Sequence, residues 1–231
     1  MTRIALIHAL AHSPAPVQAE FARQWPQAQL QNLLDDSLSA DLARRGRLDD
    51  AMTQRFITLA DYVVGCGAEA ILFTCSAFGP CIDAVRQRHA RLAVLKPNEA
   101  MVDDAVAMAR ERDGPVGLLA SFAPTLASMP AEFPAATPLR TALAEGAMAA
   151  LDRGDADAHD RAVVRAAETL ADQGARLIAL AQFSLARAAP LVAQATGLPV
   201  LTTPASAVAR LRARLDPSFQ RGASGLSSPA R

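Results

Sequence analysis

The sequence predicts an α/β protein with two pseudo-symmetric halves, each built on a parallel sheet, and a ligand site in the cleft between the halves. Two observations lead to this prediction. Short apolar runs alternate with helix-length amphipathic stretches along most of the 231 residues, a pattern typical of βαβ units. The chain also repeats part of its own sequence at a second place.

Eight short apolar runs are the predicted strands. They span residues 3–9, 28–34, 69–75, 91–95, 115–121, 139–144, 176–182 and 198–202. The central strands are apolar throughout, as expected when helices cover both faces of a parallel sheet. The helices predicted between them include residues 48–65, 98–112 and 157–173, and a last helix is predicted over 205–214.

The internal repeat predicts where the two halves begin and end. At an offset of 107 residues, "GAEAILFTCSAFGPCIDAVRQ" and "GARLIALAQFSLARAAPLVAQ" align without a gap, so that Gly67 meets Gly174 and Val85 meets Val192. A second pair of stretches overlays residues 3–13 on 115–125. The expected organisation is a first half of residues 1–96 and 205–215, a second half of residues 97–204, and a tail of residues 216–231.

Charge and hydropathy exclude some classes of partner. Basic and acidic residues number 23 each, so the formal net charge is zero and no basic field favours nucleic acid. No apolar run approaches the roughly 20 residues of a membrane span. The chain runs from Met1 into a predicted strand without the features of a signal peptide. We therefore expect a cytoplasmic protein without nucleic-acid or membrane partners, and the sequence is compatible with a homo-oligomer.

The three cysteines, Cys66, Cys75 and Cys81, suit neither a disulfide framework nor a metal site. A reducing compartment disfavours disulfides. The cysteine spacing matches no CxxC pattern. No metal is expected.

Cys75 is the strongest candidate for a reactive residue. Ligands of open parallel sheets bind beyond the carboxyl ends of the strands. The stretch "AILFTCSAFGPC" places Cys75 at such an end, before a helix expected to begin near Phe78. Because a helix N-terminus lowers the pKa of a thiol, we expect a partly exposed, reactive Cys75; the alternative is a buried, inert cysteine. Cys66 is expected in the core, and Cys81 is expected to pack nearby or, as a minor alternative, to act as a resolving cysteine.

Hydroxyl side chains follow several predicted strands. They are Ser76, Ser121, Thr125 and Thr203. With the free backbone N–H groups of such loops, they would suit a carboxylate and the enediolate-like anion derived from it. For each hydroxyl alone, a helix-capping role is the alternative. Their recurrence after different strands favours ligand binding.

Several stretches resemble a known enzyme family. "GAEAILFTCSA", "PNEA", "VGLLASFAPT", "GARLIALAQFS" and "GLPVLTTPASA" resemble the cofactor-independent aspartate/glutamate/hydantoin racemase superfamily, which includes maleate isomerase and arylmalonate decarboxylase. The resemblance covers residues 3–214. It implies two α/β halves with the site between them, a small carboxylate as substrate and no cofactor. Racemases of this family use one cysteine from each half, and Cys75, Ser76 and Ala77 match the C-N-T-like motif of the first.

The second half departs from the family pattern. The resemblance places Ala181, Gln182 and Phe183 on the second cysteine motif, G-C-T, and places Ser121 and Thr125 on the A-T-x-x-T loop that holds the substrate carboxylate. Gln182 thus replaces one of the two site cysteines, which makes the chain an atypical member. Glutamine neither takes nor gives a proton at neutral pH, so two-base racemisation is not expected in its usual form. Arylmalonate decarboxylase also has a single cysteine, but in its second half.

Two further residues are candidates for the missing proton carrier. His8 ends the first predicted strand and could bind, polarise or protonate a substrate; a hydrogen-bonded histidine at a strand end is the alternative. Lys96 ends another strand and could bind a carboxylate or act as a base; a solvated surface charge is the alternative.

The function expected from these residues and from the resemblance is that of a racemase- or isomerase-type enzyme. It would act on a small carboxylate by proton transfer next to the carboxylate, with Cys75 as the acid or base. Ser76, Ala77, Ser121, Thr125, Gln182, Phe183 and His8 would form the substrate-binding set. One alternative is a one-cysteine decarboxylase or lyase of the arylmalonate decarboxylase type. Covalent use of Cys75 as a nucleophile and a non-catalytic carboxylate-binding protein are the others.

Overall fold

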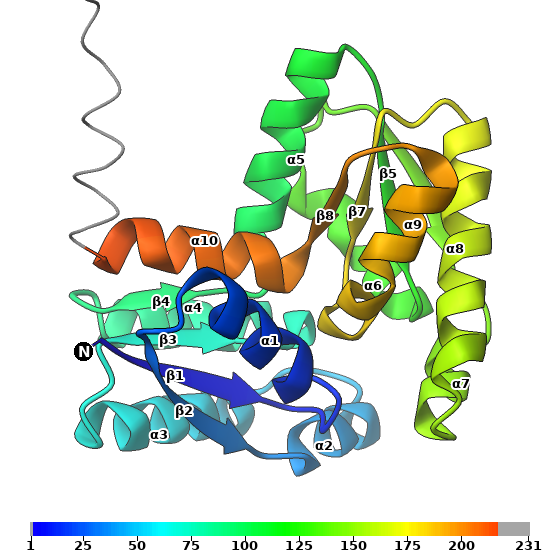
Figure 1. Cartoon of the computed structure of the whole chain (residues 1–231). Coiled ribbons are helices and arrows are strands. Elements are labelled where there is room, and N and C mark those ends of the chain that lie inside the picture. Colours follow the sequence, from blue (N-terminus) through cyan, green and yellow to red (C-terminus); the bar gives the residue numbers. More distant parts are fainter. Residues whose placement is uncertain (1, 217–231) are drawn as a thin grey trace, which may run out of the picture. The chain divides into compact units, whose positions relative to one another are not determined.

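The computed structural model describes residues 2–216, which form two compact units (Figure 1). Among the described residues, the first unit comprises residues 2–97 and 207–216, and the second comprises Asn98–Ser206. Apart from Asp216, the expected tail of residues 216–231 lies outside the described residues. None of the helices between residues 2 and 216 is both long enough and apolar enough to span a membrane.

The first unit is built on a four-stranded parallel sheet in the order β2-β1-β3-β4. Its strands are β1 (Arg3–His8), β2 (Gln29–Leu34), β3 (Ala70–Phe73) and β4 (Ala93–Leu95). Its helices are α1 (Pro14–Gln24), α2 (Ser37–Arg45), α3 (Asp50–Gly65), the short 3₁₀ helix η1 (Ser76–Phe78), α4 (Gly79–Arg88) and α10 (Thr203–Leu215), which begins in the second unit.

The second unit repeats this topology with the order β6-β5-β7-β8, again all parallel. Its strands are β5 (Val116–Ala120), β6 (Leu139–Leu143), β7 (Leu177–Leu180) and β8 (Val200–Thr202). Its helices are α5 (Glu99–Arg112), α6 (Ala123–Ser128), η2 (Met129–Glu132), α7 (Ala147–Asp152), α8 (Ala156–Asp172), η3 (Phe183–Ala188) and α9 (Ala189–Thr196). All eight strands predicted from the sequence are present, and the predicted α/β class with two parallel sheets is confirmed.

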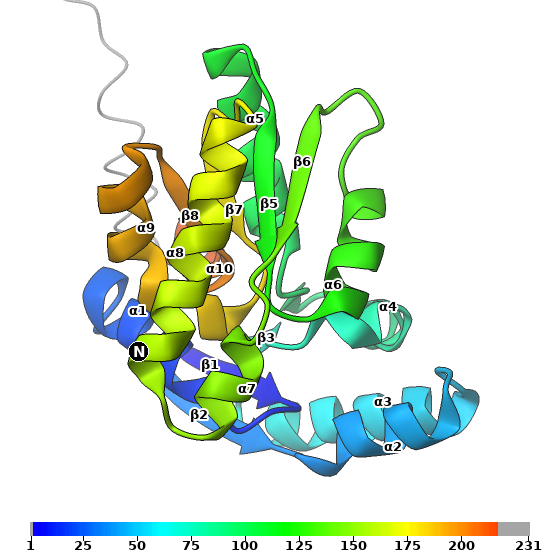
Figure 2. The same cartoon turned by 90° about the vertical axis from the view of Figure 1, so that its right-hand side faces the viewer.

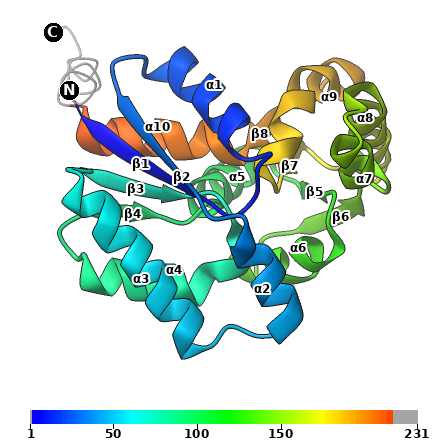
Figure 3. The same cartoon turned by 90° about the horizontal axis from the view of Figure 1, so that it is seen from below.

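Helices cover both faces of each sheet, which explains why the central strands are apolar throughout. In the first unit, Ile7, Ile71 and Phe73 pack against α3 and α4, and Figure 3 shows α1 and α10 on the opposite face. In the second unit, Ile178 and Leu180 pack against α8 and α9. The other face of this sheet packs against α5 and the α6–η2 segment (Figure 2). Every residue of β3, β5 and β7 is buried, as expected for central strands covered on both faces.

The internal repeat has a precise structural counterpart. Gly67 and Gly174 follow α3 and α8 with φ values of 87° and 86°, where a side chain would be strained. The N–H of Ala68 bonds to the Val63 carbonyl at 3.1 Å, and the N–H of Ala175 bonds to the Leu170 carbonyl at 3.0 Å. Both bonds close the same type of glycine-dependent helix end. The two units therefore use the same device to turn from a helix into the next central strand.

Candidate functional site

Cys75 lies just beyond the carboxyl end of β3, where the chain leaves the sheet for η1 and α4. Its backbone is extended, with φ −126° and ψ 120°, and it is the residue that precedes η1. The half-buried thiol packs against the apolar core of the first unit. It borders a space too narrow for a water molecule, lined also by Ile7, His8, Ala9, Leu38, Phe56 and Phe73. The strand end predicted to carry Cys75 is thus present.

The surroundings of Cys75 shift its acidity in the direction opposite to the sequence-based expectation. Burial raises the pKa of the Cys75 thiol, and the N–H of Ala77 opposes this by favouring the thiolate. Burial is the larger cause, because a thiolate on the apolar core loses more hydration than one N–H can replace. At neutral pH Cys75 is therefore a thiol, which can give a proton.

The residues after Cys75 form the turn into α4. Ser76 is half-buried and Ala77 is exposed.

Lys96 follows β4 and pairs with Asp83 of α4 at 2.8 Å between Nζ and Oδ2. A methyl group on Gly79 would lie 4.0 Å from this Nζ, so the ammonium group sits beside the first turn of α4. Lys96 is thus a paired charge, and in this conformation it is tied to Asp83.

His8 is fully buried at the end of β1 and is held by two side chains of the first unit. Its Nε2 lies 3.1 Å from Oδ1 of Asn32 on β2, and its Nδ1 lies 2.9 Å from Oγ1 of Thr74. Because the Asn32 oxygen can only accept, Nε2 carries the proton and Nδ1 accepts from the Thr74 hydroxyl. Burial lowers the pKa of His8, and the hydrogen bond to Asn32 partly offsets this effect. Both ring nitrogens are occupied, which fits a hydrogen-bonded histidine at a strand end better than a proton carrier.

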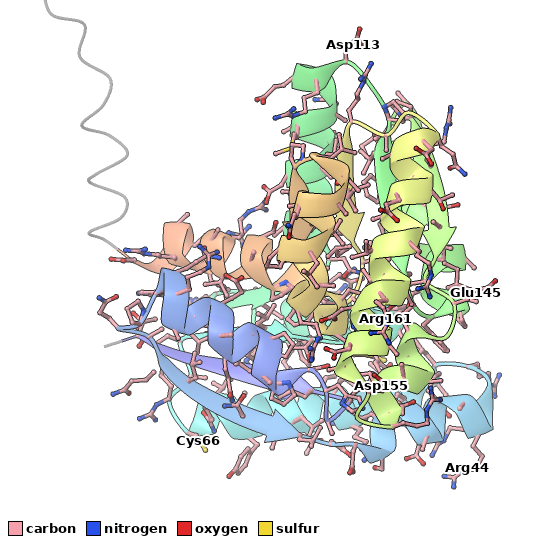
Figure 4. The ribbon with its side chains drawn as sticks, turned by 45° about the vertical axis from the view of Figure 1, so that its right-hand side comes forward. Arg44, Cys66, Asp113, Glu145, Asp155 and Arg161 are labelled. Carbon is pink, nitrogen blue, oxygen red and sulfur yellow. The ribbon has the colours of Figure 1, made fainter. Side chains whose placement is uncertain are left out.

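The other two cysteines differ in their surroundings. Cys81 is completely buried in α4, and its sulfur lies 3.5 Å from Oγ1 of Thr53. Burial raises the pKa of the Cys81 thiol. Cys66 directly follows α3 at the periphery of the first unit (Figure 4) and is half-buried, so it is more exposed than the core position expected for it. The reason is that α3 ends at Gly65, so Cys66 lies in the connection between α3 and β3 and not on the helix face that packs on the core.

Ser121 and Gln182 are directly bonded to each other in the second unit. Ser121 follows β5 and Gln182 follows β7, and these strands are neighbours in the sheet. The Gln182 oxygen Oε1 accepts the backbone N–H of Ser121 at 2.7 Å and lies 3.0 Å from its hydroxyl oxygen. Parallel strands bring their carboxyl ends to one edge of the sheet, which is why two residues so distant in the sequence meet here.

The remaining candidates of the second unit are mostly enclosed. Thr125 is buried in α6, and its N–H bonds to the Phe122 carbonyl at 3.1 Å. Phe183 is buried at the start of η3. Thr202 caps α10 by accepting the N–H of Ala205 at 3.2 Å, whereas the buried hydroxyl of Thr203 has no partner. Ser121 and Gln182 therefore meet, and Thr125 and Thr203 form no hydrogen bond with them.

Cys75 and Gln182 occupy equivalent positions in the two units. Cys75 follows β3 and Gln182 follows β7, which are the corresponding central strands of the two sheets. Each residue has an extended backbone and precedes a 3₁₀ helix. The residues before them, Thr74 and Ala181, bond through their N–H groups to the Ile7 and Leu119 carbonyls at 3.1 and 2.8 Å. The alignment that placed Gln182 opposite Cys75 in the repeat therefore agrees with the backbone of each unit.

Sequence reasoning missed the partners that fix these residues. Asn32 and Asp83 hold His8 and Lys96, respectively, and neither was singled out. Asn32 is one of three amide residues in the predicted strand 28–34, so its presence there gave no specific signal. Within residues 2–216, no three His, Cys, Asp or Glu side chains come together in the manner of a metal site.

Comparisons with known proteins give structural matches alone. The sequence matches no family model, and no curated protein matches it. A glutamate racemase from Francisella tularensis in complex with D-glutamate has a TM-score of 0.64 and 11% identity, over 99% of this chain and 84% of that one. An aspartate racemase from Picrophilus torridus has a TM-score of 0.62 and 9% identity, over 93% of this chain and 94% of that one.

A decarboxylase shares the same fold. Unliganded arylmalonate decarboxylase has a TM-score of 0.58 and 15% identity, over 100% of this chain and 96% of that one. The fold implied by the resemblance to the aspartate/glutamate racemase superfamily is thus confirmed.

Proposed function

We propose that this chain, which shares its fold with glutamate and aspartate racemases and with arylmalonate decarboxylase, is an enzyme that acts on a small carboxylate without a cofactor. It would move a proton at the carbon next to the carboxylate, with Cys75 as the acid or base. The observation that carries this proposal is the pair of equivalent strand ends, one with a thiol at Cys75 and the other with an amide at Gln182.

Within this class, a decarboxylase-type reaction fits these residues best. Loss of CO₂ from a malonate-type dianion breaks one carbon–carbon bond and leaves the electron pair on the α-carbon as an enediolate. The Cys75 thiol then gives its proton to that carbon, and the resulting thiolate regains a proton from water. The reaction needs one proton donor. The half-buried Cys75 thiol, whose pKa is raised, is in the correct protonation state at the start of each cycle.

Racemisation or isomerisation is the second candidate, favoured by the racemases among the structural neighbours. It would require a thiolate to remove the α-proton and a second group to return one. Forming the thiolate of Cys75 is disfavoured by burial, Gln182 does not titrate, and both ring nitrogens of His8 are bonded. We therefore expect exchange or racemisation to be slow in this protein.

The test is an assay in D₂O with two kinds of substrate. Disubstituted malonates report decarboxylation, and single enantiomers of glutamate and aspartate report proton exchange and racemisation. We expect the malonates to yield a product with one deuterium at the α-carbon, in excess on one face. Cys75→Ala should lose at least about 100-fold in rate, since general acid catalysis contributes about this much. Cys81→Ala and Cys66→Ser serve as matched controls and should retain the activity.

The outcomes separate the candidates. Efficient racemisation by the wild-type protein would show that the reaction is a two-base racemisation and not a decarboxylation. It would also require a second proton carrier. Malonate binding without turnover, unchanged in Cys75→Ala, would indicate a carboxylate-binding protein. Equal activity of Cys75→Ala and wild type would refute the role of the thiol.

A further inference from the structure

The Ser121–Gln182 pair determines which atoms of Gln182 are available to a ligand. A backbone N–H can only donate, so the amide atom 2.7 Å from it must be the carbonyl oxygen Oε1. This removes the ambiguity between oxygen and nitrogen that otherwise applies to glutamine side chains. The second bond, at 3.0 Å to the Ser121 hydroxyl, requires that hydroxyl to donate as well.

The donors of Ser121 are both used by this arrangement. Its N–H and its hydroxyl proton point to Oε1, so neither remains for a substrate carboxylate. The Gln182 nitrogen Nε2 is in the opposite situation. It forms no hydrogen bond with any residue in the range 2–216, and it is not among the fully buried polar atoms without a partner. Two N–H donors are thus held in place by Ser121 and left without an acceptor.

We propose that Gln182 is the residue of the second unit that binds the substrate's carboxylate, through Nε2, and that Ser121 is a positioning residue that acts through Gln182. This inference rests on the proposed function. It changes the role of Ser121, which would hold the Gln182 side chain in place and would not donate a hydrogen bond to the substrate itself. The two bonds to Oε1 fix a long, flexible side chain before the ligand arrives, which reduces the entropy lost on binding. An amide donor also discriminates between ligands: it favours an anionic oxygen and offers no acceptor to a neutral amide.

The first experiment is an NMR titration of the ¹⁵N-labelled full chain with malonate and with malonamide, its neutral counterpart. The Gln182 side-chain signal is identified as the NH₂ pair missing in Gln182→Ala. We expect malonate to shift this pair and to bind at least about tenfold more tightly than malonamide, as a charge-assisted hydrogen bond implies. Gln182→Glu places a negative oxygen at the position of Nε2 and should reverse this preference. Gln194→Glu, an exposed site on α9, adds the same charge elsewhere and should not.

A double-mutant cycle tests the indirect role of Ser121. Ser121→Ala keeps the backbone N–H but loses the hydroxyl, so malonate should bind several-fold more weakly. In a Gln182→Ala background, the same Ser121→Ala substitution should change the affinity by less than about twofold, because its effect passes through Gln182.

Three outcomes would overturn the inference. One is a Gln182 NH₂ pair that stays in place while malonate shifts other signals. Another is full additivity of the two alanine substitutions, which would indicate that Ser121 binds the ligand directly. In both cases malonate still binds, and the proposed function stands. If malonate, succinate and D-glutamate all fail to bind, the inference and the proposed function fall together.

Discussion

At the scale of single residues, the chemistry of this protein depends on which side chains are already bonded. His8 shows the principle, because its identity and its position at a strand end suggest a proton carrier. Asn32 and Thr74 form hydrogen bonds with its two ring nitrogens, so the role of His8 is structural. Cys75, by contrast, keeps its thiol proton because the apolar core beneath it disfavours the thiolate. Burial lowers the pKa of His8, which makes it a poor base. Burial raises the pKa of Cys75, which keeps the proton on its sulfur at neutral pH.

The lowered pKa of His8 predicts a loss of stability in mild acid. Since the folded state binds the proton less readily than the unfolded chain, the stabilising contribution is present above the unfolded pKa of about 6.5 and is lost as the pH falls through the lower, folded pKa. We expect His8 to titrate below 6.5 by NMR and the unfolding free energy to fall by up to about 1 kcal/mol between pH 7.5 and 5.5.

Replacement variants isolate this contribution. His8→Gln cannot titrate, so its stability should change less over the same pH interval. His12→Gln, at an exposed position, should retain the wild-type dependence. A measured His8 pKa above 6.5, or identical pH profiles for wild type and His8→Gln, would contradict the role of burial.

At the scale of elements, the two helix–glycine–strand connections are the most specific feature of the repeat. Gly67 and Gly174 adopt nearly the same positive φ, and the chain forms the same backbone hydrogen bonds around each. A residue with a side chain is strained there whatever the space around it.

Gly174→Ala should therefore destabilise the protein by about 1 kcal/mol in urea unfolding. No atom lies within 4 Å of the added methyl group, so the loss would arise from backbone strain alone. Gly65→Ala is a suitable control, because Gly65 is also free of contacts but lies within α3, where alanine should stabilise by about 0.5 kcal/mol. Equal effects of the two substitutions would show that the positive φ carries no cost.

At the scale of the whole molecule, each unit has a complete core. In Asn98–Ser206, one set of buried residues lies between the sheet and α8–α9 and another between the sheet and α5–α6. Every residue of both sets belongs to this unit. Such a unit meets the requirement for independent folding, since its apolar faces are covered by its own helices.

A fragment of residues 98–206 should therefore fold by itself. We expect a well-dispersed NMR spectrum and a single cooperative unfolding transition. Leu118→Ala in the same fragment removes a fully buried side chain and should cost about 2 to 5 kcal/mol, enough to abolish or severely weaken the transition. A fragment that gives a collapsed spectrum, identical with and without Leu118→Ala, would show that this unit needs the rest of the chain.

The sequence by itself determined the eight strands, the two-sheet architecture and the equivalence of Cys75 with Gln182. These follow from local apolar runs, glycine positions and an ungapped repeat, all of which can be identified in the sequence alone. Only the tertiary structure decided the states of the candidate groups. The raised pKa of Cys75, the bonded His8 and the Oε1 atom that Ser121 holds depend on neighbours distant in sequence. The periodicity of apolar residues predicts which face of a strand is buried. The hydrogen bonds and desolvation of a side chain depend instead on which other side chains lie beside it at the end of the sheet.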